Sequence, residues 1–470
     1  MSDNNGVSEN GGDDREAGDY DDSLQERGAR KVYEELLERV GESAPQPRLD
    51  ATRRAVEMLG DPQRAYPIIH ITGTNGKTST SRMIESLLRA HGLRTGMLTS
   101  PHLERMNERI VIDGEPISNT ALVENWNDIR PFLELTDTEL DAKGEPRLSF
   151  FEALTVLAFA AFADAPVDVV VLEVGMGGEW DSTNVADGQV AVFAPVALDH
   201  TARLGNTIAE IARTKSGIIK PSAAVVSAAQ APEALAELVR AAELTESTLA
   251  VDGTAFSLVS DTVAVGGQVI TVKGLAGTYA DVFLPLFGDH QARNATLAIA
   301  AVESFLGGGS QALNHDIVTE GFATVTSPGR LQVVGTEPTV LVDAAHNPHG
   351  ATALALAITE YFTFDHVTAV LGILGDKDAA GIMRELDAVV DEFVITQSSS
   401  DRAVDPDALA EIAVAIAGAD RVIVEPSLET ALETARDQAS RTEKGAVIVA
   451  GSITLVGEAM SYARDQGWKP

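Results

Sequence analysis

The sequence predicts an α/β fold with two domains, and three observations support this prediction. Apolar runs alternate with amphipathic helical stretches, which is the pattern of parallel sheets covered on both faces. The alternation stops at a turn-rich stretch, TSPGRL, at residues 326–331, and a second series of the same kind follows it. The chain has 470 residues, which is more than a single hydrophobic core usually supports.

The first 26 residues form an acidic segment, with nine Asp and Glu residues and a single basic residue, Arg15. Because large apolar side chains are almost missing there, burial cannot offset the entropy lost on ordering, and we predict a disordered tail over residues 1–28. This composition is typical of a solubilising tail, and a site for a specific partner is the alternative. Helical periodicity begins at Ala29 and continues through VYEELLERV.

The N-terminal domain is expected over residues 29–326. Its predicted helices include STSRMIESLLRA and FFEALTVLAFAAFA, and its predicted strands are YPIIHIT, TGMLT, VDVVVLEVG and VAVFAPV. Residues 248–287 differ, because they contain short β-branched stretches separated by glycines. This stretch indicates a small antiparallel β excursion from the main sheet.

The C-terminal domain is expected over residues 332–470, after a hinge at residues 327–331 around Pro328 and Gly329. Its predicted strands are TVLVDAAH, HVTAVLGIL, EFVITQS, RVIVE and AVIVAGS, each followed by polar or helical sequence. Apolar strands that alternate with helices predict a Rossmann-like α/β domain.

The first predicted strand runs directly into GTNGKT, residues 73–78, and then into a helix. Glycines let backbone N–H groups curl around a phosphate, the helix dipole assists, and Lys77 can reach the outer phosphates. Thr78 is placed to offer a hydroxyl to Mg²⁺. Two residues separate the two glycines, whereas the usual P-loop has four. We therefore predict a P-loop-type parallel-sheet ATPase domain with a shortened loop.

Candidate ligand groups follow the next strands. Glu173 ends an apolar strand and precedes VGMGG, at the strand end where open α/β sheets place ligand groups. A carboxylate across from Lys77 suits Mg²⁺. Asp199 and His200 follow the strand VAVFAPV, and His200 is a second candidate metal ligand. Lys215, in ARTKSGIIKP, is by itself most simply a surface ammonium group on a helix.

Charge and composition exclude several classes of protein. The formal net charge is −35 and no dense Lys/Arg cluster offsets it, so we expect neither a nucleic acid nor a membrane surface as partner. Zero cysteines exclude disulfides, thiolate metal sites and a cysteine nucleophile, and fit a cytoplasmic location. We see no signal peptide and no apolar run long enough to span a membrane.

A series of motifs is similar to that of one enzyme family. In chain order they are GTNGKTST, TSPHL with NERI, FFEALT, LEVGMGG with the following DSTN, LDH, TKSGIIKP, HQARNA, SPGRL, DAAHNP and GSITLVGE. This order resembles the folylpolyglutamate synthases, in particular the bacterial bifunctional dihydrofolate synthase/folylpolyglutamate synthase group, and more broadly the Mur-type ligases. The resemblance runs from about Lys31 to the C-terminus. GTNGKT alone indicates only Mur ligases, whereas TSPHL, FFEALT and LEVGMGG are narrower.

The resemblance implies an ATP-dependent ligase that adds L-glutamate to tetrahydrofolate and to dihydropteroate. ATP would phosphorylate the folate carboxylate, and the glutamate amine would displace phosphate from the resulting acyl phosphate. Two Mg²⁺ sites, K⁺, a carbamylated Lys215, small-molecule substrates and a monomeric state are the accompanying expectations. The alternatives are another Mur-type ligase acting on a cell-wall nucleotide precursor, and a P-loop nucleotide switch.

The resemblance also implies a role for individual residues. The implied ATP-binding residues are Thr74, Asn75, Gly76, Lys77, Thr78, Ser79, Asn294, Arg330 and Asp343. The implied metal ligands are Thr78, Ser100, Glu173, His200 and the carbamate of Lys215. Folate would be contacted by Pro101, His102, Phe151 and Asp181, with Phe150 as the alternative stacking ring. Glutamate would be contacted by His346 and Ser452. The implied catalytic set is Lys77, Glu173, His200, Lys215 and His346.

The chain departs from the family pattern beside the folate pocket. Where the family commonly has GGRLDATN, this chain has GGEWDSTN, so Glu179 stands in place of a basic residue. DAAHN and KSGI likewise replace DGAHN and KAGI. The basic-to-acidic difference changes the electrostatics around the pterin and leaves the preferred folate form open.

Overall fold

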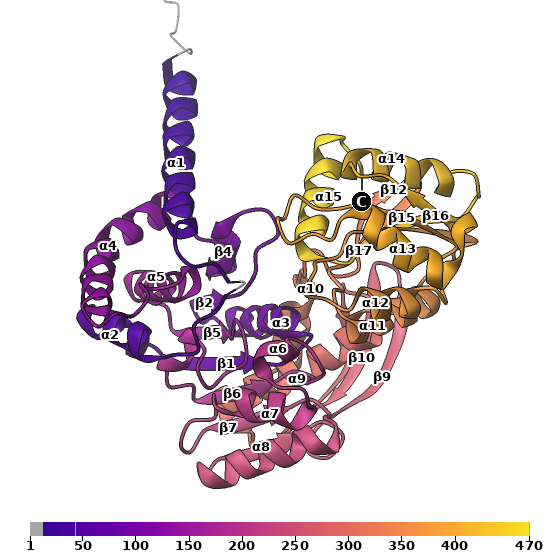
Figure 1. Ribbon diagram of the computed structural model, residues 1–470. Helices are drawn as coiled ribbons and strands as arrows, with labels where there is room; N and C mark the ends of the chain where they lie inside the picture. The colour runs from indigo at the N-terminus through magenta and orange to yellow at the C-terminus, as the bar shows by residue number, and fades with distance from the viewer. Residues whose placement is uncertain (1–12, 43, 470) are drawn as a thin grey trace, which may run out of the picture.

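The structure is a computed structural model (Figure 1), and it describes residues 13–42 and 44–469, with side chains from residue 24 onward. Two α/β bodies lie beside each other, and the C-terminal body is drawn in orange to yellow. The predicted α/β fold is confirmed, because each body contains one mainly parallel sheet with helices around it. Among the described residues, no helix is long and apolar enough to cross a bilayer.

An eight-stranded sheet forms the centre of the N-terminal body, in the order β4-β3-β2-β5-β1-β6-β7-β8. Neighbours from β2 to β8 pair in parallel, and β3 and β4 add an antiparallel edge. Because β1 and β5 are adjacent, the phosphate loop and Glu173 meet at the same sheet edge. The strands are β1 (Ile68–Thr72), β2 (Thr95–Leu98), β3 (Ile110–Ile112), β4 (Glu115–Pro116), β5 (Val169–Glu173), β6 (Val190–Phe193), β7 (Ala224–Ser227) and β8 (Thr248–Val251).

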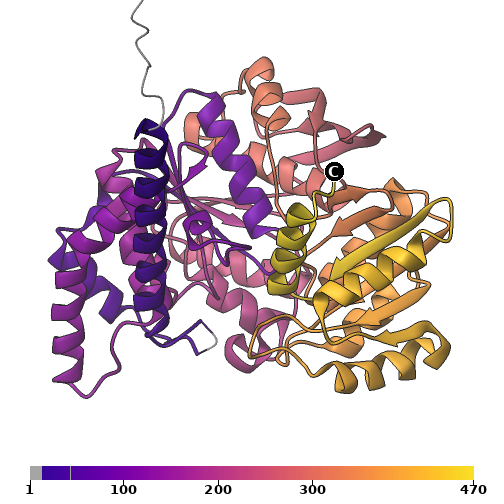
Figure 2. The same cartoon turned by 90° about the horizontal axis from the view of Figure 1, so that it is seen from above.

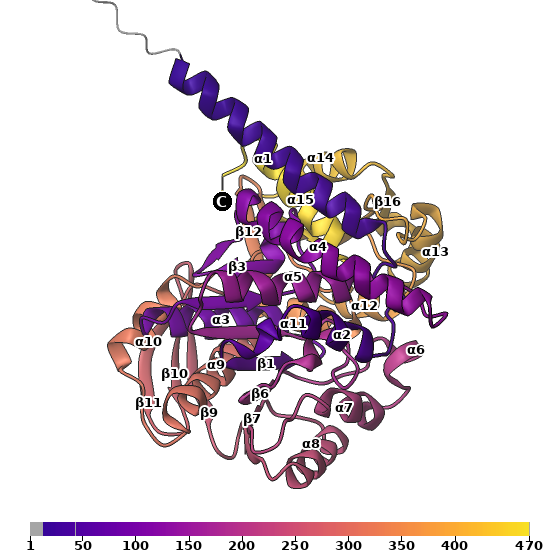
Figure 3. The same ribbon diagram turned by 90° about the vertical axis from the view of Figure 1, so that its left-hand side faces the viewer.

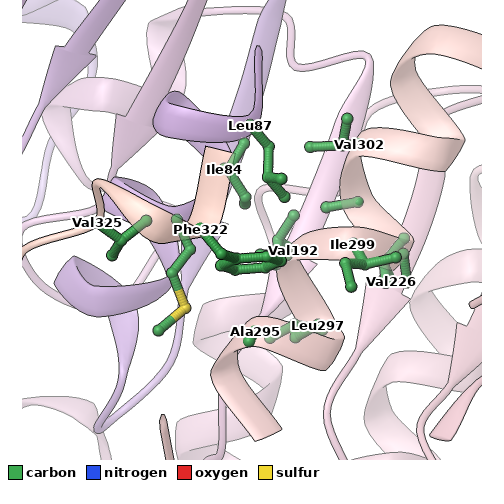
Figure 4. Close-up of a cluster of buried hydrophobic side chains, with 14 of the residues drawn as sticks. Ile84, Leu87, Val192, Val226, Ala295, Leu297, Ile299, Val302, Phe322 and Val325 are labelled. Carbon is green, nitrogen blue, oxygen red and sulfur yellow. The ribbon is translucent and has the colours of Figure 1, made fainter. Parts of the chain in front are cut away.

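Helices cover both faces of this sheet. On one face, α3, α9 and α10 bury a core that includes Leu87, Ile299 and Phe322 against β6 and β7 (Figure 4). On the other face, α1, α2, α4 and α5 bury a second core. The helices of this body are α1 (Asp13–Leu37), α2 (Asp50–Met58), α3 (Lys77–Ala90), α4 (Asn119–Asp141), α5 (Phe150–Asp164), α6 (Thr201–Leu204), α7 (Ile208–Ser216), α8 (Pro232–Leu244), α9 (Asp289–Gly307) and α10 (His315–Ala323), with 3-10 turns at Pro62–Arg64, Met106–Arg109 and Ser182–Val185.

The small β excursion is confirmed, with narrower bounds than predicted. Three antiparallel strands, β9 (Ser257–Ala264), β10 (Gly267–Lys273) and β11 (Thr278–Leu284), form a separate sheet in the order β11-β10-β9. The first part of the predicted stretch, β8, does not belong to it, because residues 248–251 continue the main sheet parallel to β7. A short apolar stretch cannot be assigned to one of two neighbouring sheets from its sequence alone.

The C-terminal body contains a six-stranded sheet in the order β12-β13-β17-β14-β15-β16, parallel except for β12. Residues 324–331 connect α10 to β12, so the predicted hinge lies between the two sheets. The strands are β12 (Gln332–Thr336), β13 (Thr339–Val342), β14 (His366–Leu371), β15 (Glu392–Ile395), β16 (Val422–Val424) and β17 (Gly445–Ala450). The helices are α11 (Pro348–Tyr361), α12 (Ala379–Leu386), α13 (Pro406–Ala417), α14 (Leu428–Ala439) and α15 (Ile453–Asp465), with a 3-10 turn at Ala419–Arg421.

Helix α1 corrects the prediction for the acidic segment. The helix begins at Asp13, so the second half of the predicted disordered tail is helical, and residues 1–12 lie outside the described residues. Figure 3 shows α1 running past α4 and projecting beyond the body, and Figure 2 shows the same helix from above. Val32 and Leu36 are buried, and Trp126 Nε1 of α4 donates to Glu35 Oε2 at 2.7 Å. This anchor, together with the Glu, Arg, Ala and Gln residues that favour helix, extends the element.

Candidate active site

The phosphate loop (residues 73–78) joins β1 to α3, as its sequence predicted. Gly76 is the N-cap residue of α3 with φ of 87°, in the left-handed region. A Cβ there would lie 2.7 Å from Asn294 Oδ1, so glycine satisfies both the backbone and its neighbour. The Lys77 ammonium folds back and donates to the carbonyl oxygen of Gly73 at 3.3 Å. An ammonium group and a helix N-terminus together provide an anion site.

Glu173 is a buried carboxylate, 1% exposed, beside this loop. Its side-chain partner is the Thr78 hydroxyl, which lies 3.0 and 3.1 Å from the two carboxylate oxygens. Burial raises the pKa of Glu173 to about 7, although Lys77 and the backbone N–H of Ser100 oppose the shift. A buried carboxyl group that has no ion-pair partner among the described residues, next to the Thr78 hydroxyl and a phosphate loop, suits Mg²⁺. The residues Thr78, Ser100 and Glu173 therefore fit the metal that the sequence suggested.

Lys215 is buried, with 4% exposure, and its Nζ donates to the carbonyl oxygen of Gly73 at 2.8 Å. The simplest interpretation of the residue alone, a surface ammonium group, was therefore wrong. Burial, followed by the charge of Lys77, lowers the pKa of Lys215 to about 7. A neutral amine is the form that reacts with CO₂, so the site suits a carbamate. A Cβ on Gly178 would lie 2.7 Å from the Lys215 carbonyl, so the loop after β5 packs directly on this residue.

Asp199 joins the two domains. Lys377 Nζ donates to its Oδ1 at 2.8 Å, Asn347 Nδ2 donates to its Oδ2 at 3.3 Å, and both partners belong to the C-terminal body. His346 Nε2 and His200 Nε2 lie 3.7 and 3.9 Å from Oδ2. Burial raises the pKa of Asp199, but the contact with His346 and the charges of His200 and Lys377 outweigh it and hold the pKa below its ordinary value. Asp199 is thus an ionised carboxylate at the domain boundary.

A second contact between the domains involves the phosphate loop itself. The amides of Asn75 and Asn347 pair reciprocally, with both N–O distances at 3.1 Å. Asn75 Nδ2 also lies 2.8 Å from His349 Nδ1. Thr74 is held within its own domain, since its hydroxyl donates to the Ala197 carbonyl at 3.0 Å. The loop after β13 in the C-terminal body therefore lies directly over the predicted nucleotide site.

Helix α9 supports the phosphate loop from the side. Asn294 Nδ2 donates to Gln291 Oε1 at 3.1 Å, and Gln291 Nε2 lies 3.4 Å from Ser79 Oγ. Ser79 Oγ is in turn 2.8 Å from Ser327 Oγ in the connection between the domains. Asn294 and Ser79 are thus brought to the loop, and their contact with ATP stays a prediction.

Asp343 and Arg330 lie next to each other at the domain connection. Asp343 Oδ2 accepts from the Leu331 backbone N–H at 2.7 Å, and Oδ1 accepts from that of Ala345 at 2.8 Å. Asp343 therefore shapes the connection, and its contact with ATP stays a prediction. The Arg330 charge lowers the pKa of Glu173, which places it near the phosphate site.

A small pocket of about 70 Å³ opens where residues 41–48, the start of α5 and the loop after β5 meet. Phe151 and Asp181, the two predicted pterin contacts, line it, and their contact with folate stays a prediction. Phe150 instead belongs to the core, where its ring contacts Tyr33 and the Arg109 guanidinium. Phe151 is therefore the ring available for stacking. The lining residues are Gly41, Glu42, Pro45, Gln46, Arg48, Ser149, Phe151, Glu152, Gly175, Met176, Trp180, Asp181 and Ser182.

Pro101 and His102 do not line this pocket. His102 Nδ1 accepts from Arg109 Nε at 2.7 Å, and the Arg109 guanidinium pairs with both oxygens of Glu42, at 2.8 and 2.9 Å. Glu42, whose side chain is 37% exposed, does line the pocket, so His102 reaches it through this ion pair. Burial lowers the pKa of His102 to about 4, which keeps the imidazole neutral.

Ser452 is the N-cap residue of α15. Its Oγ accepts from the Leu455 backbone N–H at 3.2 Å, and the side chain is buried. The cap explains part of the GSIT motif by helix stability. The predicted contact of Ser452 with glutamate stays a prediction.

Comparisons with known proteins agree with this geometry. Residues 71–302 match the Mur ligase middle domain, and residues 329–453 match the Mur ligase, glutamate ligase domain. The chain is 44% identical over 455 residues to the dihydrofolate synthase/folylpolyglutamate synthase of Mycobacterium tuberculosis, covering 92% of this chain and 93% of that protein. The chain belongs to the dihydrofolate synthase/folylpolyglutamate synthase family.

Solved structures of this family share the whole fold. A Mycobacterium tuberculosis folylpolyglutamate synthase complexed with ADP and AMPPCP superposes with a TM-score of 0.89 at 43% identity, covering 95% of this chain and 100% of that one. A Thermotoga maritima folylpolyglutamate synthase gives 0.79 at 31% identity, covering 94% and 98%. The chain is thus a ligase of the folylpolyglutamate synthase family, with both α/β domains present.

Several residues of this family member were missed by the sequence reasoning. Lys377 and Asn347 meet Asp199 from the other domain, and Arg109 and Glu42 form the ion pair behind the folate pocket. Lys377, in GDKD after a predicted strand, carried a usable signal, because charged residues at the ends of parallel strands collect at one sheet edge. Arg109 and Asn347 lie in the NERI and DAAHNP motifs, which mark their segments but not their partners, whereas Glu42 lies in a segment without such a pattern.

Proposed function

We propose that this chain uses ATP to join L-glutamate to tetrahydrofolate and to dihydropteroate. One observation carries the proposal. The loop after β5 directly follows Glu173, lines the pocket with Trp180 and Asp181, and packs against the backbone of Lys215. A folate in the pocket would therefore lie next to the phosphate loop, and its carboxylate could approach the γ-phosphorus of ATP.

The phosphoryl step requires the protein to position groups and neutralise charge. The folate carboxylate attacks the γ-phosphorus, the bond to the β–γ bridging oxygen breaks, and ADP and an acyl phosphate form. Lys77 and Arg330 would face the transferred phosphoryl group, and Thr78, Ser100 and Glu173 would hold Mg²⁺. When bound, Mg²⁺ would neutralise phosphate charge in this water-poor site.

The amide step would use the C-terminal body. The glutamate amine attacks the acyl carbonyl, a tetrahedral intermediate forms, phosphate leaves, and the amine loses its proton. His346, next to Asp199, and Ser452, at the start of α15, are the proposed glutamate contacts. The relatives that match both domains favour a folate ligase over a cell-wall ligase or a nucleotide switch.

We also propose that Lys215 carries a carbamate, which with His200 would hold a second Mg²⁺. Burial and the shifted pKa of Lys215 support a reactive amine. The modification converts a buried cation into an anion and so reverses the local charge. From the sequence we also propose that K⁺ is a further cofactor, that the protein is a monomer and that it is located in the cytoplasm.

The two domains are proposed to move about residues 327–331, opening to admit substrates and closing to exclude water. The contacts of Asp199 with Lys377 and of Asn75 with Asn347 would form in the closed arrangement. A cross-link that locks the hinge should abolish turnover and leave ATP binding intact. Full turnover in the locked protein would contradict hinge motion.

The deciding experiment is glutamate-dependent ADP release by the purified protein with Mg²⁺-ATP, with dihydropteroate and with tetrahydrofolate in parallel. Turnover with both substrates supports a bifunctional enzyme, and turnover with tetrahydrofolate alone a polyglutamate-extending enzyme. No turnover with either would refute the folate assignment. A Lys77→Met variant is the matched control for ATPase contamination, because it removes the ammonium group without changing side-chain length much.

A further inference from the structure

His70 is a buried imidazole in the middle of β1, directly before the phosphate loop. Its side chain is 0% exposed, among apolar neighbours on the same strand. Nε2 lies 2.9 Å from Thr183 Oγ1, and none of the described groups pairs with Nδ1. Burial lowers the pKa of His70 to about 3, so the ring is neutral at physiological pH.

The Thr183 hydroxyl lies between His70 and the folate pocket. It is 2.6 Å from Asp181 Oδ1, which also accepts from the Thr183 backbone N–H at 3.0 Å. The other oxygen, Oδ2, accepts from the Met176 backbone N–H at 2.8 Å. Burial raises the pKa of Asp181, and the hydrogen bonds from Thr183 and from the Met176 backbone oppose that shift and favour the carboxylate as an acceptor.

These contacts fix the direction of the hydrogen bonds. A hydroxyl has one proton, and Thr183 gives it to the Asp181 carboxylate, so its oxygen must accept from His70. The imidazole proton is therefore on Nε2, and the nitrogen without a partner is a bare acceptor. The chain of donors runs in one direction, from His70 through Thr183 to Asp181, and ends in the pocket.

We propose that His70 and Thr183 are positioning residues of the folate pocket, which hold the Asp181 carboxylate in the orientation that receives the N–H donors of a pterin ring. This inference rests on the proposed function, since Asp181 has this role only if the pocket binds a pterin. The ligand class is a fused nitrogen heterocycle with adjacent N–H groups on one edge.

Packing alone does not account for the imidazole. A Cβ on Gly188 would lie 2.9 Å from the His70 Cβ, so the site is tightly filled, but a leucine could fill similar space without burying an unpaired nitrogen. The same loop has other anchors, such as Thr155 Oγ1 at 2.8 Å from Ser182 Oγ. Among the described residues, the hydrogen bonds through Thr183 connect the Asp181 carboxylate to His70 in β1.

The test uses the full chain and two substitutions at one position. Thr183→Val removes the hydroxyl and keeps the volume, and Thr183→Ser restores the hydroxyl. The matched control is Thr368→Val in β14, because Thr368 is also fully buried and its hydroxyl has no partner among the described residues. Dissociation constants for dihydropteroate and for ADP are measured by calorimetry, with Tm as the check on folding.

We expect Thr183→Val to weaken dihydropteroate binding about tenfold or more, because a hydrogen bond to a charged group is lost, and to leave ADP binding unchanged. Thr183→Ser and Thr368→Val should bind both ligands as the unaltered protein does. His70→Leu should weaken dihydropteroate binding in the same direction, and adding it to Thr183→Val should cause no further loss, because both act through one hydroxyl.

Unchanged dihydropteroate binding by Thr183→Val would overturn the inference, as would an equal loss of ADP binding or a failure of Thr183→Ser to restore affinity. Additive losses in the double variant would show that His70 does not act through Thr183 and would overturn its assigned role. If the unaltered protein binds no dihydropteroate, the proposed function itself fails, and the inference fails with it.

Discussion

Glu173 is proposed to serve the metal site at the expense of stability in the unliganded protein, and Glu173→Gln should reveal this. The amide has the same shape and can still accept from the Thr78 hydroxyl, but it never ionises. In the unaltered protein, the carboxyl group has a folded-state pKa of about 7, above its ordinary 4.5, because it is buried. Ionisation therefore opposes folding. With respect to this group, stability is greatest below pH 4.5 and is lost as the pH rises through 7.

The size of the effect follows from that gap. Each pKa unit corresponds to about 1.4 kcal/mol. The raised pKa of Glu173 therefore lowers the free energy of unfolding of the metal-free protein by about 3 kcal/mol at pH 8, and by less than about 1 kcal/mol at pH 5. For a domain of this size, the difference corresponds to a Tm change of about 5 °C. The Tm of Glu173→Gln relative to that of the unaltered protein should rise by that amount between pH 5 and pH 8.

Thermal unfolding in EDTA at the two pH values measures this. Glu303→Gln is the matched control, because Glu303 is also buried in this domain but accepts from the Tyr279 hydroxyl and a backbone N–H of Gly277. That variant should have a lower Tm at both pH values, since an amide replaces one acceptor by a donor. Addition of Mg²⁺ and ADP should raise the Tm of the unaltered protein more than that of Glu173→Gln. A Tm difference between Glu173→Gln and the unaltered protein that is the same at both pH values would refute the assigned pKa shift.

Three further predictions concern other parts of the site. Lys215→Arg should lower kcat by about a hundredfold or more. Incubation with ¹³C-bicarbonate should give a carbamate NMR signal only in the unaltered protein. A signal that persists in the variant would exclude Lys215 as its source. Lys377→Met leaves Asp199 without its buried ion-pair partner, at a cost of roughly 3 kcal/mol. We therefore expect kcat/KM for glutamate to fall about a hundredfold. An unchanged kcat/KM would show that the ion pair is dispensable. Phe151→Ala should raise the folate KM about tenfold with little change in Tm. Phe150→Ala should instead destabilise the protein by about 3–5 kcal/mol in unfolding experiments. The reverse result would make Phe150 the stacking ring and Phe151 the core residue.

The structural features that could be predicted from the sequence are those that depend on neighbouring residues in the chain. Strands such as β1 and β5 are continuous apolar runs, and the spacing of Gly73, Gly76 and Lys77 is sufficient to predict a strand, loop and helix. Since parallel strands end at a common edge, the proximity of Glu173 to the loop also followed from the pattern.

The parts that were missed depend on distant contacts. Asp199 and Lys377 are separated by 178 residues in sequence, and nothing near either residue indicates the other. The burial of Lys215 depends on the packing of the loop after β5, which helical periodicity does not describe. Helix α1 extends to Asp13 from an anchor on α4 that the acidic composition concealed.

The convergence on Asp199 has a consequence for recombining related proteins. Lys377, Asn347 and His346 all come from the C-terminal body, and all approach one carboxylate of the N-terminal body. In a chimera that takes its two halves from different parents, this small set of residues must be compatible, even if both halves fold well on their own. Chimeras that preserve Asp199 with its three partners should keep activity more often than chimeras matched by overall identity alone.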